Sequence, residues 1–365
     1  MARNRFLSTS LLWPLSKIYG AVIGVRNWMF DIGILKQQEF DIPIISVGNI
    51  AVGGTGKTPH TEYIVDMLKN RYNIGILSRG YKRKTRGFVL ADKNSSPIQI
   101  GDEPFQMYQK FKEHQTITLA VCENRCEGIK KMRDINPAIN LLILDDAFQH
   151  RYVKPKISIV LTEFSRPVFN DNIMPLGRLR EPIHSISRAD IVIVSKCPDI
   201  MKPIDYRVFK NNLNLYPYQN LFFSRYNYGD LTSVFPEKVT YIPNLEWLTK
   251  SDALLVITGI ANPRPLIKHL KKHKTIIKVK QFEDHHHYTI DDYKSIYTAF
   301  NNLKGDRKYI ITTEKDAVRL IEGHSFPEEL KPYIFYVPIN VQFLSTDTKS
   351  FDIELNKLIM AKKLF

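Results

Sequence analysis

The residues from Ile44 to Pro59 read IISVGNIAVGGTGKTP, a buried-strand pattern followed by a glycine-rich turn and the start of a helix. Glycines let backbone N–H groups close around an anion, and the N-terminus of a helix adds a positive dipole. Lys57 can then reach the outer phosphates of a nucleotide, and Thr58 can hold Mg²⁺ through its hydroxyl. Ala51 stands where the general phosphate loop begins with a glycine, but three glycines remain in the turn. The expected nucleotide-binding residues are Ala51, Val52, Gly53, Gly54, Thr55, Gly56, Lys57 and Thr58.

A phosphate loop that works with a metal ion needs acidic side chains at the end of a nearby strand. The run LLILDDAFQH places Asp145 and Asp146 directly after four apolar residues, although capping of a loop is the simpler interpretation of one such aspartate. In IGDEPFQ, Asp102 and Glu103 precede an expected helix, and they can serve either as a general base with a metal ligand or as helix caps. The expected metal ligands are Thr58, Glu103, Asp145 and Asp146.

Two further motifs lie later in the chain. PLGRLREP carries Arg180 and Glu181 between prolines, and it is either a solvated loop or, beside a phosphate site, an anion clamp. FEDHHHYT has consecutive histidines, but adjacent residues point apart, so one histidine that shares a proton with a carboxylate is favoured over a zinc site. A switch GTPase would need an Asn/Thr-Lys-x-Asp pattern after a late strand and an Asp-x-x-Gly pattern after the acidic strand. The chain lacks both patterns at these places.

The elements that must position these residues alternate between short apolar runs and helical stretches. Runs without polar alternation indicate strands buried on both faces, as in a parallel sheet covered by helices. The pattern predicts a doubly wound α/β fold. Strands are expected at residues 43–50, 73–79, 116–121, 141–146, 157–163, 190–196, 253–260, 275–282, 308–316 and 333–339, with a final helix after about residue 350.

The pattern divides the chain into four parts. We expect an N-terminal amphipathic segment at 1–40, a phosphate-loop domain at 41–205, an extended β hinge at 206–250 and a smaller α/β domain at 251–365 that closes over the site. Three cysteines are too few for a disulfide framework.

The charge of the chain favours an anionic partner. It has 52 Lys and Arg against 37 Asp and Glu, a net charge of +15. The N-terminal segment mixes Trp13, Tyr19 and Trp28 with Lys17 and Arg26, and its apolar runs are shorter than the roughly 20 residues of a spanning helix. It is typical of a helix lying in a lipid headgroup region, and packing on the protein's own core is the alternative.

Together these motifs resemble one family. SVGNIAVGGTGKTP, LSRGYKRK, GDEP, LDDAFQHR, PLGRLREP, FEDHHHYT and TTEKDAVRL occur in the order and approximate spacing of the tetraacyldisaccharide 4′-kinases of the lipid A pathway of Gram-negative bacteria. The resemblance extends from about residue 10 to about residue 320. Ala51 fits this family's loop, whereas Ala147 stands where the family more often has glycine. That difference matters only if the position requires a positive φ.

The resemblance implies γ-phosphoryl transfer from ATP, with Mg²⁺, to the 4′-hydroxyl of an acylated glucosamine disaccharide 1-phosphate. It implies two α/β domains joined by a β hinge, and association with the cytoplasmic face of the inner membrane. Neither a nucleic acid nor an obligate protein partner is expected. By resemblance, Asp102 pairs with a histidine of the DHH motif. The expected catalytic residues are Asp102, His285, His286 and Lys57, and the expected substrate-binding residues are Arg79, Tyr81, Arg125, Gln149, His150, Arg180 and Glu181, with Lys82 as a further phosphate ligand.

Two other functions remain open from the sequence. A nucleotide-dependent partitioning ATPase can carry a similar GGTGKT loop without an acceptor pocket. A kinase of a soluble sugar or nucleoside is the second alternative, and the N-terminal amphipathic segment disfavours it.

Overall fold

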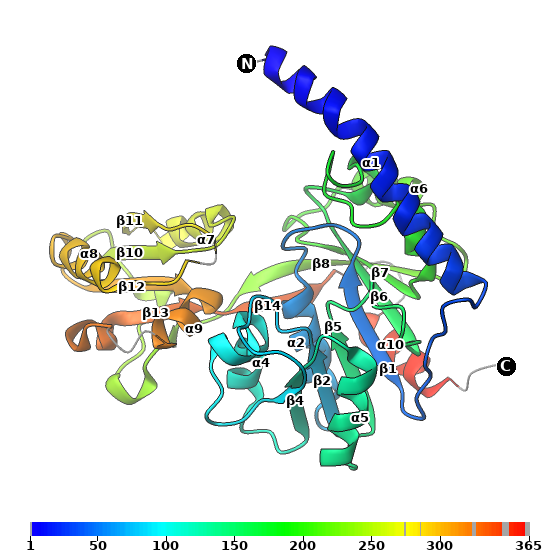
Figure 1. Cartoon of the computed structure of the whole chain (residues 1–365). Helices are drawn as coiled ribbons and strands as arrows, with labels where there is room; N and C mark the ends of the chain where they lie inside the picture. Colours follow the sequence, from blue (N-terminus) through cyan, green and yellow to red (C-terminus); the bar gives the residue numbers. More distant parts are fainter. Residues whose placement is uncertain (1, 274, 285, 323–325, 345–349, 362–365) are drawn as a thin grey trace.

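The computed structural model describes residues 2–273, 275–284, 286–322, 326–344 and 350–361. Within these ranges the strands form a larger and a smaller sheet, each covered by helices (Figure 1). The doubly wound α/β class predicted from the sequence is confirmed. The α-helices are α1 Ala2–Asp31, α2 Lys57–Leu68, α3 Pro97–Ile100, α4 Asp102–Phe111, α5 Arg125–Ile135, α6 Pro203–Leu213, α7 Arg264–Leu270, α8 Ile290–Asn301, α9 Glu314–Glu322 and α10 Phe351–Met360.

The larger sheet has the order β14-β8-β7-β6-β1-β5-β2-β4-β3. Its inner strands are parallel, and only β3 and β14 pair antiparallel with their neighbours among the described strands. The five central strands, β7, β6, β1, β5 and β2, are buried along nearly their whole length, which explains their continuous apolar sequences. The strands are β1 Ile44–Asn49, β2 Ile74–Ser78, β3 Val89–Leu90, β4 Ile117–Val121, β5 Leu141–Asp145, β6 Ile157–Glu163, β7 Ile191–Ser195, β8 Asn220–Tyr228 and β14 Ile339–Phe343.

The smaller sheet has the order β11-β10-β12-β13-β9 and its own buried cluster around Leu255 and Ile310. Two strands of the larger sheet lead to it, because β8 continues towards β9 and β13 returns through Pro338 into β14. β8 and β14 pair antiparallel, so the connection is a two-stranded ribbon (Figure 1). The strands are β9 Thr232–Ser233, β10 Ala253–Thr258, β11 Ile276–Gln281, β12 Lys308–Thr313 and β13 Ile334–Val337.

The C-terminal helix α10 lies with the larger unit and not with the smaller one, to which the sequence pattern assigned it. Phe351, Leu355 and Ile359 belong to the same buried cluster as Ile45 and Leu141 of the larger sheet. The return of the chain along β14 places the start of α10 beside that sheet. Residues 206–228 also contribute to the larger unit, since Phe209 of α6 packs in one of its clusters and β8 extends its sheet.

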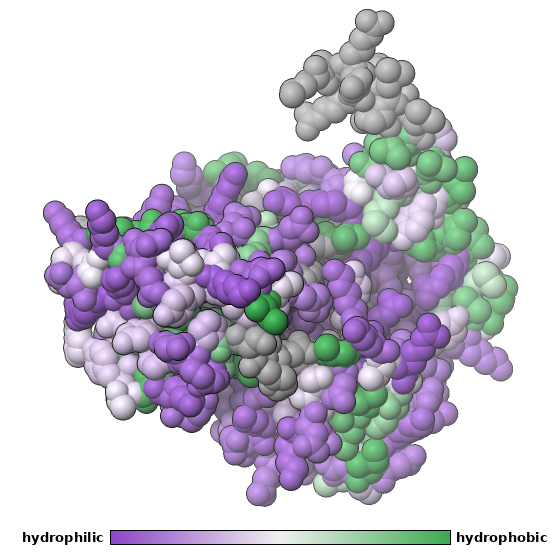
Figure 2. Space-filling model, turned by 60° about the vertical axis from the view of Figure 1, so that its left-hand side comes forward, coloured by the Kyte–Doolittle hydropathy of each residue, from purple (hydrophilic) through white to green (hydrophobic). Residues whose placement is uncertain are grey.

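Helix α1 lies along the edge of the larger unit, and its first turns extend past the body of the molecule (Figure 1). Many of its apolar side chains are exposed, and hydrophobic residues line it in Figure 2. They include Trp13, Leu15, Ile18, Val22, Val25 and Trp28, each more than half exposed. In the described part of the chain, no helix combines the length and apolarity needed to cross a membrane.

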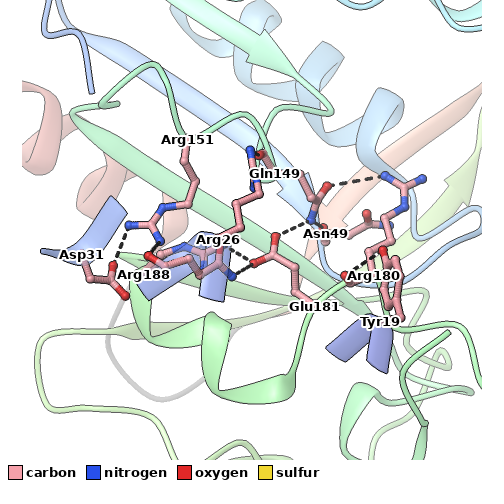
Figure 3. A network of polar contacts seen from close by, with 10 residues as sticks. Tyr19, Arg26, Asp31, Asn49, Gln149, Arg151, Arg180, Glu181 and Arg188 are labelled. Atoms are coloured by element: carbon pink, nitrogen blue, oxygen red, sulfur yellow. Dashed lines mark hydrogen bonds and ion pairs between the residues drawn. The ribbon is translucent and has the colours of Figure 1, made fainter. Parts of the chain in front are cut away.

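The buried face of α1 is held by polar contacts (Figure 3). Asn27 donates from Nδ2 to Oε2 of Glu181 at 2.9 Å, and Glu181 is only 1% exposed. The same carboxylate accepts from Arg188 at 2.7 Å and from Gln149 at 3.0 Å. Arg26 donates to the carbonyl oxygen of Gln149 at 3.1 Å. Glu181 therefore joins the helix to the loop that follows β5.

Further contacts fix both ends of the docked segment. Tyr19 donates to the carbonyl oxygen of Arg180, and Ser16 donates to that of Ile173. Arg151 donates to the carbonyl oxygen of Asn27 and to the Asp31 carboxylate (Figure 3).

Replacement of Glu181 by alanine is expected to lower the free energy of unfolding by about 3 kcal/mol, because a mostly buried Arg188 loses its carboxylate. Urea unfolding followed by tryptophan fluorescence measures the change. Glu127→Ala removes an exposed ion pair with Lys131 and is the control, expected to leave stability nearly unchanged. Wild-type stability combined with a raised KM for the acceptor would instead support the substrate-binding role expected from the sequence.

Candidate active site

The phosphate loop lies between the end of β1 and the start of α2. The register of β1 with β5 places Val47 opposite Asp145, so the loop and the two aspartates lie at the same edge of the larger sheet. Gly53 and Gly56 have φ angles of 114° and 93°, which favour glycine. A Cβ atom on Gly56 would lie 2.1 Å from the Tyr226 hydroxyl, so this strand of the connecting ribbon also requires glycine there.

Side chains at the ends of β1 and β7 hold the loop through hydrogen bonds. Asn49 donates to the Thr55 hydroxyl at 2.7 Å, and Ser195 at the end of β7 donates to the Thr55 carbonyl at the same distance. Lys196 donates to the carbonyl oxygen of Gly54. The sequence motifs did not predict this role for Ser195 and Lys196. Their position at the carboxyl end of a buried strand, in the same sheet as the strand that leads into the loop, was the available signal.

His60 links the loop to the connecting ribbon. Its Nδ1 lies 2.7 Å from the Gly56 carbonyl oxygen, and its Nε2 lies 2.8 Å from Oγ of Ser224 in β8. A carbonyl oxygen only accepts, so Nδ1 carries the proton and Nε2 accepts from the serine. Burial lowers the pKa of His60 to about 4, which keeps the ring neutral. No local sequence pattern singles out His60.

The two aspartates after β5 have different environments. Asp145 is buried and accepts hydrogen bonds from Thr61 and Ser78, each at 3.2 Å. Burial raises its pKa to about 7, and the charges of Glu103 and Asp146 add to the rise. Asp146 has a φ of 48° and lies 3.5 Å from Nζ of Lys57. Nη1 of Arg180 lies 3.6 Å from the same oxygen.

The positive φ therefore falls on Asp146. The described non-glycine residues that have a positive φ do not include Ala147. The alanine found where the family more often has glycine is compatible with this backbone.

A magnesium ion fits the chemistry of these donors. The described residues contain no group of three His, Cys, Asp or Glu side chains arranged to hold a metal ion. Mg²⁺ needs few protein ligands, however, because it keeps several waters and binds the phosphates of the substrate. Burial, and after it the charges of Glu103 and Asp146, raise the pKa of Asp145, and a cation bound beside these carboxylates would favour its ionised form. Glu103 also lies 3.6 Å from Nζ of Lys315.

Asp102 begins α4 and faces the smaller unit. Its Oδ2 accepts from Nε and Nη2 of Arg319 in α9, at 3.0 and 2.6 Å. His285 lies outside the described residues. Nε2 of His286 lies 2.8 Å from Oδ2 of Asp292, and its ring stacks on Phe282. The expected pairing of Asp102 with a histidine thus stays a prediction.

The predicted substrate-binding residues fall into different settings. Arg79 and Tyr81 line an open hollow of about 400 Å³ together with Lys82. Arg125, in contrast, is 2% exposed and donates to the carbonyl oxygens of Cys122 and Asp145. Arg125 therefore supports the end of β5 from inside the protein.

The remaining four predicted substrate residues lie near the loop after β5. His150 is partly buried and its Nε2 accepts from the backbone N–H of Arg125 at 3.4 Å, while desolvation and then the Arg125 charge lower its pKa to about 4. Gln149 and Glu181 belong to the network that docks α1, and Arg180 lies between that network and Asp146.

Comparisons with known proteins show the family to which the chain belongs. The family model described as "Tetraacyldisaccharide-1-P 4'-kinase" matches residues 8–360. The chain is 49% identical over 348 residues to a tetraacyldisaccharide 4′-kinase of Bacteroides thetaiotaomicron, covering 93% of this chain and 90% of that protein. It is 47% identical over 354 residues to the protein of the same name from Phocaeicola vulgatus, covering 96% and 95%.

A solved structure extends the similarity to three dimensions. The crystal structure of LpxK from Aquifex aeolicus in complex with ATP is similar with a TM-score of 0.72 and 26% identity, over 96% of this chain and 98% of that one. Sequence and fold thus agree over nearly the whole length. The chain belongs to the tetraacyldisaccharide-1-phosphate 4′-kinase family.

Proposed function

We propose that this chain transfers the γ-phosphate of ATP to the 4′-hydroxyl of a tetraacylated glucosamine disaccharide 1-phosphate, a lipid A precursor. One observation carries the proposal: a phosphate loop and two aspartates share one edge of the sheet, and a further carboxylate, Asp102, begins the nearby helix α4. A partitioning ATPase would need only the phosphate loop and the two aspartates, and not the further carboxylate. Membership of the family supports the kinase over that alternative.

The loop binds the donor. Backbone N–H groups from Gly53 to Thr58 surround the phosphates, and Lys57 neutralises the charge that develops between the β- and γ-phosphates. Its present contact with Asp146 is an ion pair that a phosphate can replace. When bound, Mg²⁺ supplies further neutralisation and orients the phosphates, and Thr58, Glu103, Asp145 and Asp146 are the residues that would hold it.

Asp102 is the proposed general base. It removes the proton from the 4′-hydroxyl as the oxygen attacks the γ-phosphorus, and the bond to the leaving ADP breaks. A histidine of the DHH motif, His285 or His286, shares or tunes that proton. The histidines belong to the smaller unit and Asp102 to the larger one, so closure between the units completes the site.

Cations near the site suit an anionic acceptor. The hollow beside Arg79, Lys82 and Arg86 presents several exposed basic side chains. We assign to this hollow and to Arg180 the role of gripping phosphate or sugar groups of the acceptor, with Tyr81 facing its lipid portion.

A lipid acceptor remains in a bilayer, so the enzyme must work at a membrane surface. Helix α1 exposes an apolar face with Lys17 and Arg26 beside it, as interfacial helices do. We assign this face to the cytoplasmic surface of the inner membrane, whose anionic lipids also attract a chain of charge +15.

The assay for the main proposal uses γ-labelled ATP and a total lipid extract from Gram-negative bacteria. Label is expected to enter the lipid phase, and Lys57→Ala is expected to abolish the transfer. Asp102→Asn is expected to slow it by about 10²-fold or more without preventing ATP binding. Release of labelled inorganic phosphate alone would favour the partitioning ATPase, and label on a water-soluble product would favour a kinase of soluble sugars or nucleosides.

Binding of Mg²⁺ and ATP, premixed, is expected to release up to about one proton per chain at pH 6.5. The pKa of Asp145 is about 7 without a cation, so its carboxyl is mostly protonated at that pH and must ionise beside the metal. The release should decline as the pH rises above 7, where the group is already ionised. Calorimetry in two buffers of different ionisation enthalpy measures it. An equal release from Asp145→Asn would contradict the assignment.

Substitution of Ile18 and Val22 by aspartate is expected to reduce binding to anionic phospholipid vesicles by at least tenfold. Both side chains are exposed, and neither contributes to the contacts that dock α1. Vesicle co-sedimentation measures binding. Ile353→Asp alters an equally exposed isoleucine on α10 and serves as the control. Unchanged binding by the double variant would show that α1 does not contact the membrane.

A further inference from the structure

Helix α9 is shared between the two units. Val318 packs in the buried cluster of the larger sheet, whereas Ala317 and Leu320 pack in that of the smaller sheet. Because successive residues face opposite units, side chains of this helix can connect the two.

Arg319 makes such a connection with nearly all of its surface buried. Its side chain is 1% exposed. Nε and Nη2 donate to Oδ2 of Asp102 in the larger unit, while Nη1 donates to the Gly259 carbonyl oxygen at 3.0 Å and to Oδ1 of Asp316 at 3.1 Å in the smaller unit. The planar guanidinium thus fixes the Asp102 carboxylate relative to two groups of the other unit.

The smaller unit holds its end of this connection firmly. Asp316 is fully buried, and its Oδ2 accepts from the Gly259 N–H at 2.9 Å and from the Thr313 hydroxyl at 2.7 Å. Burial raises the pKa of Asp316, and these two hydrogen bonds together with the Arg319 charge oppose that rise. The arginine is therefore oriented from the smaller unit before it meets Asp102.

Gly259 brings the histidine segment to the same place. A Cβ atom there would lie 3.1 Å from Oδ1 of Asp316, 3.2 Å from the Glu283 carbonyl oxygen and 3.4 Å from Cβ of His286. The absence of a side chain lets Glu283 and His286 lie close to Gly259, beside the Asp316 carboxylate. Asp102 is therefore linked through Arg319 and Gly259 to the surroundings of His286.

We propose that Arg319 is a positioning residue, which orients the Asp102 carboxylate for proton removal and ties that orientation to the placement of the smaller unit. The inference rests on the proposed function, in which Asp102 is the general base. A base works only at hydrogen-bond distance from the proton, and a misplacement of about 1 Å can cost roughly 10²-fold in rate. Arg319 itself does not contact the reacting groups.

The first test compares Arg319→Gln with Arg319→Lys in steady-state kinetics. Arg319→Gln is expected to lower kcat by about 10- to 100-fold, with KM for ATP and for the lipid changed by less than about twofold. Arg319→Lys keeps the charge but loses the two parallel donors, and it is expected to recover part of the loss. A wild-type kcat in Arg319→Gln would overturn the inference.

A double-mutant cycle separates positioning from a general structural effect. If Arg319 acts through Asp102, the Asp102→Asn, Arg319→Gln double variant is expected to be no slower than Asp102→Asn alone. Losses that multiply would overturn the inference. Arg307→Gln is the matched control, since Arg307 also binds a carboxylate through two nitrogens, but that of Asp252, away from the site. Its effect, if any, is expected to multiply with that of Asp102→Asn.

A second variant covers the case in which Arg319→Gln does not fold, which thermal unfolding detects. Asp316→Asn preserves the shape of the side chain and weakens its hold on Arg319. A three- to tenfold loss of kcat is expected in the wild-type background, and no further loss is expected when Asp102→Asn is already present. The inference would be overturned if kcat were unchanged, or if the loss multiplied with that of Asp102→Asn. If Asp102→Asn itself keeps more than about a tenth of the rate, the proposed base is wrong instead.

Discussion

The proposed active site, at one edge of the larger sheet, depends on the parallel register between β1 and β5, which places Val47 opposite Asp145. Because the two strands end together, the loop after β1 and the aspartates after β5 share one small volume. Burial makes charge in that volume costly, and the pKa of Asp145 rises to about 7 as a result. Lys57 and Arg180 both lie near Asp146. In the proposed reaction, a nucleotide with its cation would enter a site whose ion pairs phosphate groups can replace.

The smaller unit is connected to this edge in two ways. The ribbon that leads to it begins in the larger sheet, where Ser224 and Tyr226 of β8 lie against His60 and Gly56 beside the loop. Through α9, Arg319 meets Asp102. A change in the placement of the smaller unit would thus act on both the donor side and the acceptor side of the proposed reaction.

The sequence predicted what is local and missed what depends on contacts between distant segments. The strands and the loop follow from apolar runs and glycine spacing within a few residues. The partnership of Asp102 with Arg319 joins positions 217 residues apart, and no local pattern contains it. Arg125 and Glu181, which are among the expected substrate-binding residues, are both buried. Sequence reveals the charge of such residues but not the direction in which they point.

Helix α1 reverses the usual arrangement of a surface helix. Its inward face carries Ser16 and Asn27 in hydrogen bonds, and Gly20 approaches Ile173 closely, whereas most large apolar side chains face outward. A helix packed on the protein's own core, the alternative left open by the sequence, would bury those side chains instead. Exposed apolar surface costs about 25 cal/mol per Å² in water. The membrane contact proposed for α1 would remove that cost by placing the outer face in an apolar medium, which is also the setting of the proposed lipid acceptor.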